Sequence, residues 1–258
     1  MQEIFKNMGA IFALILKQAF TKGTSVLWEN RGFVQLYLKT TFGKYKDKEI
    51  RFSLSYLIKI QIPETDKYLL VLNRRIDKQL QPVGGVYKRH GDDRLFNSWD
   101  YRPDTFKKGL GTDTISNQDL RFRIPGKHAV KAIKWFEEGK EREISINREF
   151  DEELINTKIL DEHIFKNINY KHLKRFSKNL VWSEYHNCYE ILIYDIFEFL
   201  PSQEQALALK DLNKIPNNLA NGYAIVECDQ IEQLRYCEDN HQLAKIGHHT
   251  KLIINQKF

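Results

Sequence analysis

The stretch Arg148-Glu149-Phe150-Asp151-Glu152-Glu153 is the part of the chain around which the other motifs are arranged. On a helix, residues three and four positions apart share a face, so Glu149, Glu152 and Glu153 should converge there. Their repulsion is relieved only where a cation neutralises it, and hard divalent metals such as Mg²⁺ or Mn²⁺ bind carboxylate oxygens. We therefore expect the three glutamates to be metal ligands and catalytic residues. A solvated helix face is the alternative interpretation.

The neighbouring positions predict which side of this helix is buried. Ile146, Phe150 and Leu154 form an apolar stripe beside the acidic face, so the helix should bury one side and present acid on another. Ser145 stands directly before the periodic run, where an N-cap residue is expected. Arg148 lies at the edge of the acidic face and is placed to hold one carboxylate by a forked hydrogen bond.

A glycine pair lies upstream of the acidic stretch. Gly84 and Gly85 follow the apolar run 68–72, which we predict to be a strand, and we interpret the pair as a turn. Because glycine has no side chain, a ligand or metal can approach the backbone closely there. A plain hairpin turn is the alternative, and only the acidic helix downstream argues against it.

Together these motifs resemble the box of the NUDIX hydrolases, in which a Gly-Gly turn leads through a loop to a helix with the pattern Arg-Glu-apolar-any-Glu-Glu. Gly139, nine positions before Arg148, agrees with this order. The resemblance implies an α/β fold of the NUDIX type, with a mixed β-sheet between helices. It also implies Mg²⁺-dependent attack of water on a nucleoside diphosphate linked to another moiety. The Gly85 carbonyl would be a further metal ligand, and Arg148 would orient the carboxylates.

Residues 68–155 look more specifically like the SMODS-associated NUDIX family, which is linked to bacterial cyclic-oligonucleotide signalling systems that defend against phage. Four phrases carry this likeness: Asn-Arg-Arg at 73–75, Gln-Pro-Val-Gly-Gly-Val-Tyr-Lys at 81–88, Leu-Arg-Phe-Arg-Ile-Pro-Gly-Lys at 120–127 and Trp-Phe-Glu-Glu-Gly-Lys-Glu-Arg-Glu at 135–143. The resemblance implies a nucleotide or nucleotide derivative as ligand. We expect it to contact Gly84, Gly85, Arg74 and Lys140.

The chain departs from the family pattern at two places. Lys140 stands eight positions before Arg148, where active NUDIX enzymes usually have a glutamate, and the glycine usual after the final glutamate pair is missing. Lys140 would compete with the cation or bind substrate phosphate as a point charge. Glu137, Glu141 and Glu143 lie close by and could substitute at a different spacing. We therefore expect slow or narrow hydrolysis. The alternatives are a catalytically weak sensor of a nucleotide second messenger and an adaptor that uses the fold as a scaffold.

Composition narrows the class of protein. The 258 residues are 42% hydrophobic and 29% charged, which is ordinary for a soluble globular chain. Three widely spaced cysteines predict neither a zinc site nor disulfides, which fits a cytoplasmic location, and no histidine falls at a metal-ligand spacing. The net charge of +6 favours anionic partners, but residues 1–48 hold eight Lys and Arg against three acidic residues. We therefore expect no general nucleic-acid binding, and we keep a homodimer as an option.

We divide the chain into a basic N-terminal extension with an apolar helix, residues 1–48, and a NUDIX-like domain, residues 49–258. The apolar run within residues 4–20 is too short to span a bilayer and lacks the features of a secretory signal. No transmembrane segment is therefore expected. We predict a helix docked on the core, with a peripheral membrane anchor as the alternative.

A long insertion, about residues 87–127, separates the glycine pair from the acidic helix. It places Phe96, Trp99, Tyr101 and Phe106 among basic residues. Aromatic rings beside Arg and Lys can stack a nucleobase and hold its phosphates. Packing of these rings back on the domain is the alternative, although loops of this length are more often functional or disordered than neutral.

Periodicity and turn residues predict the remaining elements. We expect strands at 34–38, 52–60, 120–124, 180–182, 189–200 and 223–226, and helices at 129–138, 202–212, 232–242 and 251–254. Gly139 should end the first of these helices as a C-cap. The strand at 189–200 should be buried on both faces.

Overall fold

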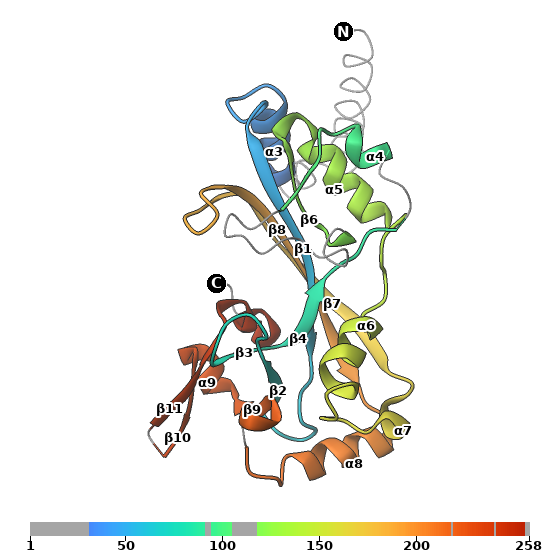
Figure 1. Ribbon diagram of the computed structural model, residues 1–258, viewed down its shortest axis with the longest axis vertical. Coiled ribbons are helices and arrows are strands. Elements are labelled where there is room, and N and C mark those ends of the chain that lie inside the picture. The colour runs from blue at the N-terminus through green and yellow to red at the C-terminus, as the bar shows by residue number, and fades with distance from the viewer. Residues whose placement is uncertain (1–30, 91–93, 105–117, 218, 240, 256–258) are drawn as a thin grey trace.

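The computed structural model describes residues 31–90, 94–104, 118–217, 219–239 and 241–255. Residues 4–20 and Phe106, about which we made predictions, lie outside this part of the chain. Within it, no helix combines the length and the apolar character needed to cross a membrane. The molecule is elongated, and a second, smaller sheet lies beside one end of the first (Figure 1).

Strand β1 (Glu49–Lys59) is the axis of the first sheet. β8 (Cys188–Leu200) pairs with one edge of β1 in parallel. The other edge is shared by two antiparallel strands, β6 (Arg121–Pro125) beside the first half of β1 and β4 (Val83–Val86) beside the second. The outer strands of this mixed sheet are β7 (Asn169–Ser183) and β5 (Arg102–Pro103).

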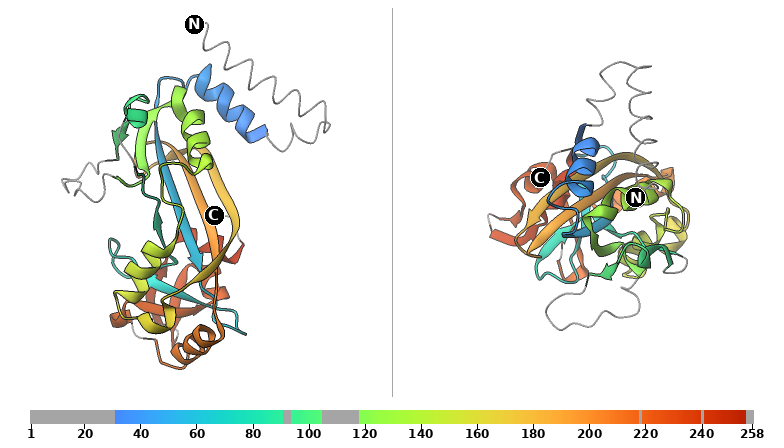
Figure 2. Two further views of the ribbon diagram at one scale, coloured as in Figure 1. Left: turned by 90° about the vertical axis from the view of Figure 1, so that its right-hand side faces the viewer. Right: turned by 90° about the horizontal axis from the view of Figure 1, so that it is seen from above.

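One face of this sheet is covered by helices (Figures 1 and 2). Phe52, Leu54 and Tyr56 alternate along β1, as the strand period of two requires, and are fully buried in the core beneath these helices. The helices that contribute to this core are α3 (Arg31–Thr41), α4 (Arg94–Asn97), α5 (Ala129–Glu138), α6 (Asn147–Phe150), η3 (Asp151–Ile155), α7 (Glu162–Phe165) and α8 (Gln203–Leu212).

The opposite face of the first sheet meets the second sheet. Leu57 of β1 and Ile196 of β8 are buried in a separate core with Leu70, Val226 and Leu252. The strand order of the second sheet is β10 (Arg235–Glu238), β11 (His241–Ile246), β3 (Gln79–Gln81), β2 (Lys67–Leu72) and β9 (Tyr223–Glu227). Short helices complete the chain: η2 (Gly126–His128), η4 (Leu219–Asn221), α9 (Cys228–Gln233) and η5 (His248–Ile254). The predicted α/β fold is confirmed, but the layer on this face is mainly a sheet rather than helices.

Most elements with strong local signals are confirmed. α5 ends at Gly139, whose φ of 69° is the left-handed conformation expected of a C-cap. α8 begins with a capping box, in which Ser202 and Gln205 each accept a hydrogen bond from the backbone N–H of the other. β8 is buried on both faces over most of its length. The predicted strands at 52–60, 68–72, 120–124, 180–182 and 223–226 lie within or overlap β1, β2, β6, β7 and β9.

The predicted strand at 34–38 is wrong, because these residues belong to helix α3. Leu36 and Thr40 are buried four positions apart, and Phe33 and Tyr37 pack partly against the same core. Leu38 lies on the other side and is 52% exposed. Spacings of three and four are those of an amphipathic helix, and five residues are too few to distinguish them from strand alternation.

The predicted helix at 232–242 is also wrong. α9 ends at Gln233 and is followed by the C-cap Leu234, whose φ of 59° is left-handed. The chain then forms the antiparallel pair β10–β11. Tyr236 is only 2% exposed in the second core. Burial of this ring within the sheet overrides the local helix preference. The predicted helix at 251–254 lies within the 3-10 helix η5.

The insertion packs on the domain where the structure describes it. Phe96 and Trp99 are 3% and 4% exposed, and the ring centroids of Phe96 and Trp135 lie 5.0 Å apart. Tyr101 makes an edge contact with Phe96 at 5.3 Å. These three rings support the packing alternative over base stacking. The insertion also supplies β6, which lies directly beside β1.

Candidate active site

The acidic helix packs beside the strand that carries the glycine pair. Ile146, Phe150 and Leu154 are fully buried, which confirms the predicted apolar stripe. The helix begins one residue later than predicted, with Ile146 as its N-cap. Ser145 Oγ nevertheless accepts a hydrogen bond from Asn147 N at 3.1 Å, so this side chain still satisfies a backbone donor at the helix start.

The second half of this helix is a π-helix. α6 ends at Phe150, and η3 continues the chain with the wider π turn, a rare conformation that is frequent at functional sites. The side chains of Glu149 and Glu152 are 15% and 42% exposed, whereas Glu153 is buried at 9%. The α-helical spacing predicts one shared face, but the structure gives the three carboxylates different environments.

Gly84 and Gly85 lie within strand β4, so their assignment to a turn is wrong. Both pair with β1. A Cβ atom on Gly85 would lie 2.0 Å from Glu149 Oε1, so only glycine allows this carboxylate to reach the strand. Gly84 N donates a hydrogen bond of 3.0 Å to Glu153 Oε2. The glycine pair therefore contacts two of the three acidic side chains.

Arg148 connects the acidic helix to the segment before it. Its forked hydrogen bonds go to Glu143, from Nε to Oε1 at 3.0 Å and from Nη2 to Oε2 at 3.1 Å. Nη1 donates to Glu149 Oε1 at 2.5 Å and lies 3.6 Å from Glu152 Oε1, and Nη2 also donates to Val86 O at 3.0 Å. Burial alone would lower the pKa of Arg148, but the contacts with Glu143 and Glu149 outweigh it and raise the pKa. Glu143 is thus the principal acidic partner of Arg148.

Removal from water raises the pKa of two of the glutamates, Glu153, which is buried, and Glu149, which is partly buried. Burial raises the pKa of Glu153 to about 8, against the opposing effect of the Gly84 N–H, and the charge of Glu149 raises it further. Burial also raises the pKa of Glu149, although Arg148 acts in the other direction. A nearby cation would favour the ionised form of both side chains.

The chemistry of these groups fits a hard divalent cation. The side-chain donors are all carboxylate oxygens, the ligands that Mg²⁺ and Mn²⁺ prefer, and a bound cation would favour the ionised form of Glu153, whose pKa burial raises. Yet the residues that the structure describes include no group of three or more His, Cys, Asp or Glu arranged to hold a metal. Glu149 is held by Arg148 instead, and Glu153 by Gly84 N.

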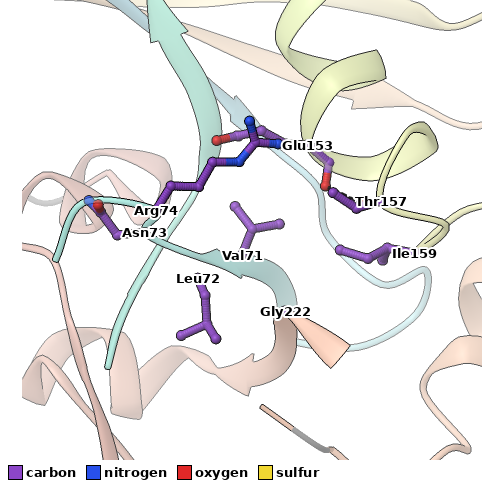
Figure 3. A pocket seen from close by; sticks show the side chains of 8 residues that line it. All are labelled: Val71, Leu72, Asn73, Arg74, Glu153, Thr157, Ile159 and Gly222. Atoms are coloured by element: carbon purple, nitrogen blue, oxygen red, sulfur yellow. Dashed lines mark hydrogen bonds between the residues drawn. The ribbon is translucent and has the colours of Figure 1, made fainter. Parts of the chain in front are cut away.

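Arg74 lies beside the acidic helix, and Lys140 does not contact it. Arg74 Nη2 donates to Glu152 O at 2.8 Å, and Figure 3 shows this side chain reaching toward Glu153. Arg74 and Glu153 line a pocket of about 200 Å³, together with Val71, Leu72, Asn73, Thr157, Ile159 and Gly222. The Lys140 side chain is 78% exposed, and its Nζ lies 3.9 Å from Glu138 Oε2.

A larger groove of about 470 Å³ runs along the face of the first sheet that does not carry the acidic helix. Gly84 and Gly85 form part of its wall, so β4 borders both the groove and the buried glutamates. The wall also contains Ser53, Ser55, Arg75, Arg121, Tyr185, Tyr194 and His249.

Sequence reasoning did not identify the arginines that β6 places on the groove face of the sheet. The alternation Arg121-Phe122-Arg123-Ile124 could have indicated them, since Phe122 and Ile124 are fully buried and period two then sends both arginines to the opposite face. For Glu143, the sequence predicts only that it could substitute for the glutamate missing at position 140. The pairing of Glu143 with Arg148 depends on the backbone conformation of residues 139–146. These residues contain no regular helix, so sequence spacing does not predict the pairing.

One comparison with known proteins finds a match. The family model described as SMODS-associated NUDIX domain matches residues 49–254, from the first residue of β1 to the last residue of η5. The matched range contains both sheets, the glycine pair and the whole acidic helix. No curated protein and no solved structure matches the chain.

Proposed function

The chain belongs to the SMODS-associated NUDIX domain family, and from this premise we propose that it is a metal-dependent hydrolase of a nucleoside diphosphate linked to another moiety. Family membership supports a nucleotide-related hydrolase or binding module. The observation that carries the finer proposal is the contact of the buried Glu149 and Glu153 carboxylates with Gly85 and Gly84 of β4, beside a groove large enough for a nucleotide.

Each residue of the site has a role in this proposal. Glu149, Glu152, Glu153 and the Gly85 carbonyl would hold Mg²⁺ or Mn²⁺, which when bound neutralises the diphosphate and activates water. Arg148 holds Glu149 in place, and Glu143 fixes Arg148 through the forked pair. Such supporting contacts orient ligands and tune affinity.

The groove would receive the nucleotide. Its volume of about 470 Å³ falls within the range of roughly 300–1,000 Å³ typical of small-molecule sites. Gly84 and Gly85 allow the ligand to approach the β4 backbone, because they lack side chains. Arg74 lines the pocket of about 200 Å³ together with Glu153. There it would contact the moiety that is linked to the nucleoside diphosphate.

A second candidate function is a sensor that binds a nucleotide second messenger without turnover. Two observations favour it: Arg148 neutralises Glu149, and the described residues form no ready metal cluster. In either case we propose a setting in bacterial antiphage signalling, a cytoplasmic location and a homodimer. Light scattering after gel filtration would test the dimer.

The test of hydrolysis is turnover of a panel of dinucleotides and nucleotide sugars in Mg²⁺, followed by phosphorus NMR. We expect slow cleavage of the diphosphate by the wild type and none by the Glu152→Gln/Glu153→Gln double variant. Cleavage by the double variant would remove the acidic helix from the reaction. Binding of a nucleotide that stays intact, with a rise in the melting temperature by mass action, would identify the sensor.

A further inference from the structure

Three arginines of β1 and β6 lie on the groove face of the first sheet, Arg51, Arg121 and Arg123, and two of them are neutralised. Arg51 donates from Nε to Asp104 Oδ2 at 2.7 Å and from Nη1 to Glu190 Oε1 at 2.6 Å. Arg123 donates to Asp104 Oδ1 at 3.0 Å and to Glu49 Oε1 at 3.1 Å. These pairs are expected of guanidinium groups on a largely buried strand surface, because unpaired buried charge is costly.

Arg121 is the exception. It lies two residues before Arg123 on β6, opposite Ser53 of β1, and is partly buried. Its side chain makes no hydrogen bond or ion pair with any residue in the described ranges. Burial lowers the pKa of Arg121, and the charge of Arg75 lowers it further, although Asp119 opposes both. Asp119 is thus a nearby charge, but no carboxylate in the described ranges hydrogen-bonds to this guanidinium, so an anion in the groove could take that place.

The groove places Arg121 where a ligand could supply that anion. Arg121 and Arg75 both line it, together with Gly84 and Gly85 of β4. Two aromatic rings, those of Tyr194 and His249, lie in the same wall. They are stacked, with their centroids 6.3 Å apart. Burial lowers the pKa of His249 to about 4, so this ring is neutral at pH 7.

We propose that Arg121, assisted by Arg75, forms an anion subsite that takes a phosphate group of the nucleotide bound in the groove. A guanidinium offers five N–H donors in a planar fork that matches two phosphate oxygens, and this pairing is strong where water is excluded. The proposal extends the proposed function by assigning the group that recognises a phosphate. It does not depend on turnover, because hydrolase and sensor alike must bind their nucleotide.

The test is calorimetric binding of adenosine, AMP and ADP to full-length protein without divalent metal. Arg121→Gln should weaken AMP and ADP binding about 10- to 100-fold, the range for losing hydrogen bonds to a charged group, and leave adenosine binding unchanged. Arg121→Lys should recover part of the loss. Arg102→Gln is the matched control, since Arg102 lies on the adjacent β5 and is 77% exposed, and it should bind all three like the wild type.

A stability measurement distinguishes a binding arginine from a structural one. Because Arg121 has no hydrogen bond or ion pair to lose within the described ranges, and only the charge of Asp119 nearby, Arg121→Met should raise the melting temperature of the ligand-free protein by about 2 °C or more. A lowered melting temperature, or AMP affinity equal to wild type in Arg121→Gln, would overturn the proposal. If Arg121→Gln loses AMP affinity but the wild type cleaves no diphosphate, only the hydrolase proposal fails. If the wild type cleaves diphosphate but Arg121→Gln binds AMP as tightly as the wild type, only the subsite proposal fails.

Discussion

At the scale of single residues, burial and charge conflict at Glu153. Its carboxyl has a folded-state pKa of about 8, raised from 4.5 chiefly by burial. Because the folded form holds its proton to higher pH than the unfolded form, this group favours folding fully below about pH 4.5. That contribution is lost as the pH rises through about 8, with a slope of at most about 1.4 kcal/mol per pH unit for one proton.

The first prediction follows from that slope. Between pH 5 and pH 8 the free energy of unfolding of the metal-free protein should fall, and Glu153→Gln should remove much of the fall because glutamine has no proton to lose. Urea unfolding at pH 5, 6.5 and 8 measures it. Glu138→Gln, at an exposed site of α5, retains Glu153 and should keep the wild-type slope. An equal slope in wild type and Glu153→Gln would contradict the assigned pKa.

Gly85 provides the second prediction at this scale. A Cβ atom there would lie 2.0 Å from Glu149 Oε1, so Gly85→Ala must displace the carboxylate. We expect a loss of about 1–3 kcal/mol in stability, as for other overpacked sites, together with a loss of Mg²⁺-induced thermal stabilisation. Gly32→Ala is the control, because its Cβ position in α3 has no other atom within 4 Å beyond the adjoining residues and the backbone of the helix itself. A Gly85→Ala protein with the wild-type response to Mg²⁺ would show that the close approach is unimportant.

At the scale of elements, the sequence predicts those whose cause is local. α5 is fixed by its apolar stripe and Gly139, and α8 by the capping box at Ser202. Gly84-Gly85 has the local features of a turn, but pairing with β1, which is distant in the chain, makes it a strand. The π turn at Asp151–Ile155 has no such local signature. The sequence therefore predicts which glutamates belong to the site but not how their side chains are arranged in space.

The third prediction concerns the connection between α5 and α6. In the family pattern, the usual glutamate stands eight positions before Arg148, where this chain has Lys140. Because residues 139–146 contain no regular helix, this spacing does not determine which side chain lies next to Arg148. Glu143 makes the forked pair with Arg148. Glu143→Gln should therefore lower metal affinity about 10- to 100-fold, measured by calorimetry with Mn²⁺.

Lys140→Glu is the matched comparison for Glu143→Gln. Lys140 is exposed beside Glu138, and Glu143 already pairs with Arg148. A glutamate at position 140 should therefore add little, and Lys140→Glu should leave Mn²⁺ affinity and turnover within about twofold of wild type. A clear gain of turnover in Lys140→Glu would show that the missing glutamate limits the site and that Glu143 does not replace it.

At the scale of the whole molecule, β1 joins the parts of the site. One edge of β1 carries β4 and β6, so the glycine pair and Arg121 lie along the same strand although more than thirty residues separate them in the sequence. The acidic helix lies on one face of this sheet and the groove on the other, with β4 bordering both. Because such long-range pairing decides which residues meet, the sequence indicates the chemistry of the site but not its shape.

The most direct test of a cation at the acidic helix is Mn²⁺ binding followed by electron paramagnetic resonance, with wild type and the Glu152→Gln/Glu153→Gln double variant compared at pH 8. Removing two carboxylates should weaken binding at least about tenfold, because the ligands are hard anionic oxygens. Glu137→Gln/Glu138→Gln, which removes two carboxylates from α5, should bind like the wild type. Equal Mn²⁺ affinity in wild type and the Glu152→Gln/Glu153→Gln variant would contradict a metal site at this helix.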